Sequence, residues 1–195
     1  SKDLMATIIQ ERKSTGRIYI QNVDNVNNQG PFKPDLAPIR QSNLCVSGLT
    51  KLDVLIDGRS ARIFMKDMPD PKVHDVWISA FNLDTKFSTY TKVSAFAMTN
   101  SSAKVLRVYD PSFDREIIVT SDHQVYTTNR GYVVAGELQP SDKLLSKVFQ
   151  DLTGKIELEI SHLEEEIPVY DITVPETSNF FANDILVHNS MITFV

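Results

Sequence analysis

The sequence has 195 residues, a formal net charge of -5 and a pI near 5.3, which suits one domain with a sizeable core or a smaller domain with flanking segments. Its Lys and Arg residues are scattered, so the charge pattern argues against binding to nucleic acid. No apolar run approaches the length that spans a bilayer, and residues 1–16 are typical of a short polar helix rather than a signal peptide. We therefore expect a soluble, cytoplasmic protein that contacts neither nucleic acid nor membrane.

The sequence contains a single cysteine, Cys45. A disulfide within the chain is thus impossible, and a cysteine-based zinc site would need several such ligands. The thiol has two interpretations, an inert small hydrophobe or a reactive nucleophile. The first is favoured unless a partner group is found elsewhere in the chain.

Residues 1–44 differ in character from the rest of the chain. After the polar helix they contain one short expected strand, at 17–25, and then a loop-rich tract with three prolines. We expect this part to be poorly packed, because it has little apolar surface to bury.

From Cys45 onward, short segments rich in Val, Ile, Thr, Tyr and Phe alternate with polar turns, which predicts a mostly β architecture. The expected strands lie at 52–58, 76–81, 91–99, 103–110, 115–127, 131–138, 143–149, 155–161, 167–175 and 179–187. Asn129-Arg130-Gly131 suits a tight hairpin with Gly131 at positive φ. The polar segments 67–75 and 161–168 are expected to be loops, and their histidines, His74 and His162, are assigned no role.

The last expected strand is followed by His188, Asn189 and Ser190, and then by a second apolar run. On this segment alone the simpler interpretation is a turn, because Asn and Ser often close turns through hydrogen bonds to nearby backbone. A functional interpretation needs support from other parts of the chain.

Three further motifs provide that support: CVSGLT at 45–50, TSDH at 120–123 and VYDITV at 169–174. Each is weak alone. In this order, and together with HNS at 188–190, they resemble the splicing motifs of inteins over residues 45–189. The resemblance implies an all-β Hint fold, a horseshoe-like arrangement of bent antiparallel hairpins that brings the two ends of this segment together.

The resemblance also implies a reaction at the upstream bond. Cys45 would attack the carbonyl of Leu44 and convert the Leu44-Cys45 peptide bond into a thioester, because a thiolate is the strongest nucleophile available. Thr120 would hydrogen-bond near this amide, and His123 would protonate its nitrogen.

The later steps follow at the downstream end. Ser190 would attack the thioester, and Asn189 would then cyclise to a succinimide and release its bond to Ser190 with help from His188. Asp171 matches an aspartate that coordinates the first two steps in the family. The scheme requires no cofactor and no metal.

Two features set this chain apart within the family. Many inteins have a His before the Asn-Phe pair of the C-terminal block, whereas here Ser178 precedes Asn179 and Phe180. In addition, residues 124–168 are too few for a homing endonuclease, which predicts a mini-intein without endonuclease activity.

Residues 1–44 resemble the large subunit of class I ribonucleotide reductase in STGRIYIQNVDNVNN and APIRQSNL. We therefore expect an N-terminal flank at 1–44 from this host, a splicing domain at 45–189 and a C-terminal flank at 190–195, in a monomer that acts on its own flanks. Two alternatives remain open: a Hint domain that only cleaves, and a reductase fragment in which Cys45 is a redox thiol. The order of the motifs favours splicing over both.

Overall fold

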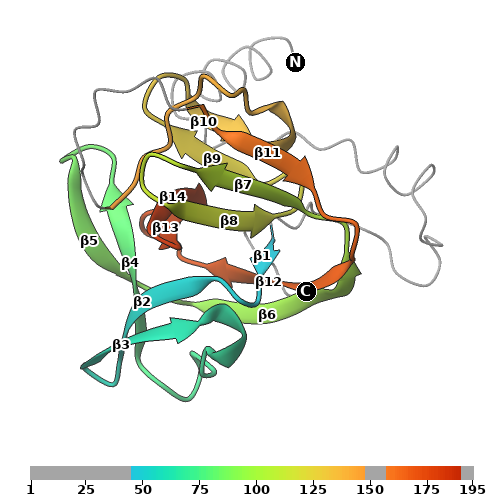
Figure 1. Ribbon diagram of the computed structural model, residues 1–195. Helices are drawn as coiled ribbons and strands as arrows, with labels where there is room; N and C mark the ends of the chain where they lie inside the picture. The colour runs from blue at the N-terminus through green and yellow to red at the C-terminus, as the bar shows by residue number, and fades with distance from the viewer. Residues whose placement is uncertain (1–44, 148–156, 190–195) are drawn as a thin grey trace, which may run out of the picture. The chain divides into compact units, whose positions relative to one another are not determined.

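The computed structural model describes residues 45–147 and 157–189. The expected N-terminal helix, the strand at 17–25 and the loose packing of residues 1–44 lie outside the described residues, as do Leu44 and Ser190. Within the described residues the regular structure consists of β-strands and two short 3-10 turns, η1 (Met65–Asp67) and η2 (Ala135–Glu137), as the expected all-β architecture requires (Figure 1).

The largest sheet has six strands in the order β11-β7-β8-β1-β12-β6, and its pairs are antiparallel. Its strands are β1 (Val46–Ser47), β6 (Ala95–Ala103), β7 (Leu106–Asp110), β8 (Arg115–Val119), β11 (Glu159–His162) and β12 (Ile167–Thr173). The short strand β1 lies between β8 and β12 (Figure 1), because Val46 pairs with Val119 on one side and with Tyr170 on the other. The start of the expected splicing domain is therefore buried in the middle of this sheet.

Two four-stranded sheets complete the described structure. One has the order β10-β9-β14-β13, and the other has the order β3-β2-β4-β5. The first consists of β9 (Gln124–Thr127), β10 (Gly131–Val134), β13 (Asn179–Ala182) and β14 (Ile185–His188), and the second of β2 (Lys51–Ile56), β3 (Arg59–Phe64), β4 (Val76–Asn82) and β5 (Phe87–Lys92). His188 is thus the last residue of a strand that is buried along its length, and Asn189 directly follows it.

Residues from all three sheets form one apolar core. Val, Ile and Leu side chains dominate it, as expected for short strands with alternating inward positions. Its largest fully buried apolar side chains include Phe180, Leu52, Met65, Ile78, Ile117, Ile172 and Ile185. Because Phe180 belongs to β13 and Ile185 and Val187 belong to β14, the C-terminal hairpin is anchored in the core before the chain reaches His188.

The turns follow the chemistry of their residues. Gly131 has a φ of 71°, as predicted for the β9–β10 hairpin, and Asp57 and Gly58 close the β2–β3 hairpin with φ values of 50° and 79°. The β13–β14 hairpin turns at Asn183 and Asp184, with φ values of 48° and 68°, which suits residues of the Asn and Asp type.

The single strand predicted at 91–99 is divided in the structure. The main-chain N-H of Val93 donates to Val76 in β4 (2.9 Å), whereas the N-H of Ser94 donates to Thr173 in β12 (2.9 Å). The chain therefore changes sheets between these two neighbouring residues, which separate the end of β5 at Lys92 from the start of β6 at Ala95.

Other predicted strands also differ from the structure. The single strand expected at 115–127 is divided into β8 and β9, and the single strand expected at 179–187 is divided into β13 and β14. Residues 143–147 form two isolated bridges, through Leu144 and Ser146, rather than a strand. The strand β3 was not predicted, because its sequence RSARIF alternates poorly and its outer side chains are exposed. Such a composition is typical of an edge strand, and β3 pairs with β2 alone.

Candidate active site

Cys45 is buried beside the β1 strand, with 2% of its surface exposed. Its main-chain N-H donates to the hydroxyl Oγ1 of Thr120 (3.3 Å), and its carbonyl accepts the N-H of Thr120 (3.0 Å). Its thiol Sγ lies 2.9 Å from the hydroxyl of Thr99 in β6. Both polar groups of the Cys45 main chain are thus held by one residue, and the thiol is held by another.

The segment between β8 and β9 positions the next two predicted residues. Thr120 directly follows β8, which pairs with β1, so its hydroxyl reaches the nitrogen of Cys45. The N-H of His123 donates to the carbonyl of Thr120 (3.0 Å), and the carbonyl of His123 accepts the N-H of Ala135 (2.7 Å). The imidazole of His123 is completely buried. This turn therefore provides the hydroxyl of Thr120, which accepts a hydrogen bond from the nitrogen of Cys45, and the buried imidazole of His123.

Asp171 lies in β12, on the other side of β1. Since Val46 pairs with Tyr170 in antiparallel register, Cys45 lies opposite Asp171. The carboxyl group of Asp171 is buried, with 1% of the residue exposed. Burial raises the pKa of the Cys45 thiol to about 12; the hydrogen bond with Thr99 acts in the opposite direction, and the carboxylates of Asp171 and Asp122 raise it further. At neutral pH the thiol is therefore protonated at rest.

His188 ends the β14 strand and Asn189 follows it, and both residues are buried. The Nδ1 of His188 lies 2.5 Å from the carbonyl oxygen of Asn189, the oxygen of the bond between Asn189 and Ser190. The ring of His188 packs edge to face against Tyr132, with centroids 5.0 Å apart. This contact restrains the imidazole in the orientation that reaches the carbonyl.

Pairing between β9 and β14 brings the two ends of the expected splicing domain together. Val187 pairs with Val125 in antiparallel register, and continuing this register just beyond the ends of β14 and β9 sets Asn189 opposite His123. Residues in opposite positions of such a pair have Cβ atoms about 5 Å apart. Because His123 is also linked through Thr120 to Cys45, the predicted residues of the two ends converge on one region.

The residue that replaces the family's usual histidine has a structural contact to this region. The carbonyl of Ser178 accepts the N-H of Asn189 (3.1 Å), and Ser178 itself has a φ of 55°. Next to it, the side-chain amide of Asn179 bonds both main-chain groups of Phe81 at 3.0 Å. Ser178 thus contributes a backbone group, rather than a side-chain imidazole, to the position of Asn189.

Two residues near these groups, Thr99 and Tyr132, were not identified from the sequence. The sequence drew attention to Ser178, but not to the contact that its carbonyl makes. Thr99 and Tyr132 lie in strands and look like ordinary strand residues in the sequence. A backbone carbonyl leaves no signal in a sequence at all. The contacts of these residues depend on how distant strands pair, which the sequence alone did not provide.

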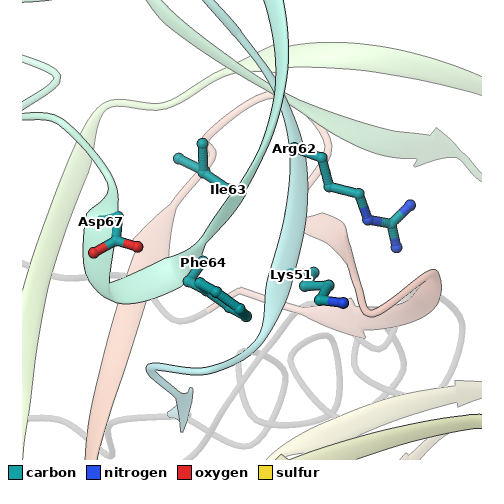
Figure 2. Close-up of a pocket in the computed structure, with 5 residues that line it drawn as sticks. All are labelled: Lys51, Arg62, Ile63, Phe64 and Asp67. Atoms are coloured by element: carbon teal, nitrogen blue, oxygen red, sulfur yellow. The ribbon is translucent and has the colours of Figure 1, made fainter.

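A pocket of about 400 Å³ lies elsewhere, over the β2–β3 hairpin. In Figure 2, Phe64 lies between Asp67 on one side and Lys51 and Arg62 on the other. None of the predicted site residues lines it, and its walls are those of a surface depression beside an edge strand. The residues that carry chemistry are instead buried between strands.

Comparison with known protein families places this geometry in context. The family described as "Intein splicing domain" matches residues 54–189, a range that contains Thr120, His123, Asp171, His188 and Asn189. The chain belongs to the intein splicing domain family. Protein splicing, an autocatalytic reaction in which the intein excises itself from its flanks, is accordingly its function.

Solved intein structures share the fold. A DnaB intein from Synechocystis sp. PCC 6803 is 26% identical, with a TM-score of 0.63 over 76% of this chain and 100% of that chain. The DnaX mini intein from Spirulina platensis is 25% identical, with a TM-score of 0.55 over 74% of this chain and 99% of that chain. The intein described here therefore has the Hint fold that the sequence motifs predicted.

The N-terminal flank has a different relationship. The family described as "Ribonucleotide reductase, barrel domain" matches residues 1–51, and 44 residues are 61% identical to ribonucleoside-diphosphate reductase 1 subunit alpha of Escherichia coli (strain K12). The match spans 23% of this chain and 6% of that relative. The match to the reductase family therefore ends before the range 54–189 that matches the intein family. Across residues 45–147 and 157–189, no helix has the length and apolar character needed to cross a membrane.

Proposed function

We propose that this intein splices by cleaving the Leu44-Cys45 and Asn189-Ser190 bonds and joining Leu44 to Ser190. In the first step the sulfur of Cys45 bonds to the carbonyl carbon of Leu44, and the bond from that carbon to the Cys45 nitrogen breaks. The thiol proton ends on the freed nitrogen, so the step is an isomerisation that needs no cofactor.

Thr120 and His123 assist this first step. The Thr120 hydroxyl lies 3.3 Å from the nitrogen of Cys45, where it holds the scissile amide and favours a departure from its resting conformation. The imidazole of His123 delivers the proton that the nitrogen requires as it leaves. Asp171, opposite Cys45 in the register of β1 and β12, receives or steers protons between the first step and the next.

Ser190 carries out the second step. Its hydroxyl attacks the thioester carbon, the Cys45 thiolate leaves, and the upstream flank becomes an ester on Ser190. Convergence of the two ends of the domain makes this attack effectively intramolecular, which accounts for a large part of the rate.

Asn189 then releases the joined flanks. Its side-chain nitrogen attacks its own carbonyl carbon, forms a succinimide and expels the amine of Ser190; the ester afterwards rearranges to an amide. The observation that carries this proposal is the 2.5 Å approach of His188 Nδ1 to the Asn189 carbonyl oxygen. An N-H at that position stabilises the oxyanion that forms during cyclisation.

The proposed reaction sets the boundaries of the domain, and the similarity of residues 1–51 to the reductase supports the proposed host. Residues 1–44 form a flank that derives from the large subunit of a ribonucleotide reductase, residues 45–189 form the intein and residues 190–195 form the second flank. The protein acts on its own flanks as a monomer, without nucleic acid or homing endonuclease activity. A reduced thiol is required, which fits the cytoplasm.

Two single variants test the assignment of the bonds. Cys45→Ala is expected to abolish cleavage before residue 45 and to leave cleavage after residue 189, whereas Asn189→Ala is expected to do the reverse. Masses of the released fragments identify the bond that was cut. Cleavage at any other bond, or upstream cleavage in Cys45→Ala, would refute the assignment.

A further inference from the structure

The antiparallel pairing of β6 with β12 contains an irregularity beside Cys45. Tyr170 pairs with Met98, but Val169 pairs with Asn100, so Thr99 is an extra residue without an opposite partner in β12. This is the arrangement of a β-bulge, and bulges beside active sites redirect a side chain. Here the redirected side chain is that of Thr99.

The hydroxyl of Thr99 meets two groups. Its Oγ1 lies 2.9 Å from the Sγ of Cys45 and 3.2 Å from the carbonyl oxygen of Val169, to which it donates. A hydroxyl has a single hydrogen to give. While Thr99 donates to Val169, its oxygen can only accept the S-H of Cys45, and this arrangement suits the protonated thiol.

We propose that Thr99 is a further active-site residue, one that holds the Cys45 thiol at rest and turns its hydroxyl to donate to the sulfur as the thiol proton leaves. The inference rests on the proposed function, in which Cys45 is the nucleophile. Thr99 exchanges the bond to Val169 for a bond to the sulfur and keeps its own proton. The thiol proton still ends on the Cys45 nitrogen, so the balance of the first step is unchanged.

The surroundings of the sulfur explain why such a donor is needed. The thiol is buried, and the carboxyl groups of Asp171 in β12 and Asp122 before β9 both disfavour a negative sulfur. A hydrogen bond to an ionised group is stronger than one to a neutral group. The bond from Thr99 therefore gains strength as charge develops on the sulfur, which is the behaviour of a group that lowers a barrier.

The test uses the full chain and separates the two cleavages. Upstream cleavage is measured with dithiothreitol in an Asn189→Ala background, and downstream cleavage in a Cys45→Ala background. Thr99→Val replaces the hydroxyl with a methyl group of similar size, and Thr99→Ser retains the hydroxyl. Thr99→Ala also lacks the hydroxyl but adds no methyl group, so it controls for a steric effect of the methyl group that valine introduces. Thr91→Val, a fully buried threonine in β5, is the control for loss of a hydroxyl outside the site.

Thr99→Val and Thr99→Ala are expected to slow upstream cleavage about tenfold, the effect of losing one hydrogen bond to a charged group. In these two variants, downstream cleavage should stay within about twofold of the parent, because that reaction does not use the bond from Thr99 to the sulfur. In Thr99→Ser, upstream cleavage should stay within about threefold of the parent, because serine keeps the hydroxyl that makes this bond. Thr91→Val should match the parent in both cleavages.

Three results would overturn the inference. The first is upstream cleavage that is unchanged in Thr99→Val. The second is an equal loss of both cleavages in Thr99→Val and Thr99→Ala, which would indicate a structural role. The third is upstream cleavage in Thr99→Ser that is as slow as in Thr99→Val. A parent chain that does not cleave upstream at all would refute the proposed function instead, so the two failures are distinguishable.

Discussion

In the proposed mechanism Cys45 acts as a nucleophile although its thiol is protonated at rest. Its pKa is raised to about 12, chiefly because it is buried. The thiolate that attacks Leu44 therefore forms only when a nearby group takes the proton. The buried imidazole of His123 and the buried carboxyl group of Asp171 are the groups that the fold brings to this region.

This arrangement predicts an unusual pH profile for the first step. If the thiol proton passes to a group inside the site, the resting and reactive forms hold the same number of protons. Upstream cleavage by dithiothreitol in Asn189→Ala should then vary less than about threefold between about pH 8 and about pH 10, when the total reductant is adjusted to keep the concentration of its thiolate constant. A tenfold rise with each pH unit would mean that the proton is lost to solvent, which contradicts the account.

His188 offers a second prediction at the scale of a residue. In a Cys45→Ala background, His188→Ala should slow cleavage after Asn189 by about 100-fold to 1,000-fold, the usual effect of removing one oxyanion donor. Gel densitometry over time measures this rate.

The matched comparison for His188 is Tyr132→Leu, which removes the ring contact but leaves the imidazole in place. Its loss of rate should be smaller than that of His188→Ala. In the Asn189→Ala background, upstream cleavage by His188→Ala should match the parent. Equal losses at both ends would indicate damage to the fold rather than a role at the Asn189 carbonyl.

Among the elements, β1 is the shortest and the most constrained. It lies between β8 and β12, and Gly48 directly follows it. A Cβ at Gly48 would lie 2.6 Å from Cε2 of Tyr170. That ring is stacked on Phe96, with centroids 5.8 Å apart and planes within 5°, so it cannot withdraw easily. The glycine of the CVSGLT motif thus permits β1 to pack closely on β12.

Gly48→Ala should therefore destabilise the fold by about 1 to 3 kcal/mol through overpacking. The measurement is urea unfolding in the Cys45→Ala, Asn189→Ala background, which remains intact. Adding Tyr170→Leu removes the ring and should make the Gly48→Ala change less costly than it is beside tyrosine. Additive effects of the two substitutions would contradict a direct clash.

Local patterns in the sequence were sufficient for many elements of the fold. The β9–β10 hairpin followed from alternating apolar residues and from the turn residue Gly131. The β13–β14 hairpin did not, because a single strand was predicted at 179–187 and the chain instead turns at Asn183 and Asp184. The change of sheet after Val93 was missed because it depends on two distant partners, Val76 and Thr173. Sequence motifs likewise suggested Cys45 and His188, but the contact of Thr99 with the thiol arises from a bulge in the pairing of β6 with β12.

On the scale of the described domain, the C-terminal hairpin is fastened to two other sheets at its turn. The side-chain oxygen of Asn183 accepts the N-H of Lys51 in β2 (2.6 Å), and its amide donates to the carbonyl of Glu116 in β8 (2.7 Å). Next to it, the buried carboxylate of Asp184 pairs with Arg62 (2.8 Å) and Arg115 (3.3 Å). These contacts hold β14, and with it His188 and Asn189, in register with β9.

Asn183→Gly should test this fastening without straining the turn, because glycine tolerates the φ of 48°. Loss of both side-chain bonds should reduce the free energy of unfolding by about 1 to 3 kcal/mol and slow cleavage after Asn189. Asn183→Ala should cost more, since it adds backbone strain to the same loss. Downstream cleavage that is unaffected by Asn183→Gly would show that the turn does not position β14.

The central claim is that this chain joins Leu44 to Ser190 while releasing residues 45–189. The most direct measurement is intact-mass spectrometry of freshly expressed chain under reducing conditions, followed by fragmentation of the small product. The Cys45→Ala, Asn189→Ala variant is the uncleavable reference. The account predicts loss of the precursor, a species spanning 45–189 that ends in a succinimide, and a peptide in which Leu44 is followed by Ser190. A stable precursor, or release of both flanks without the joined peptide, would contradict it.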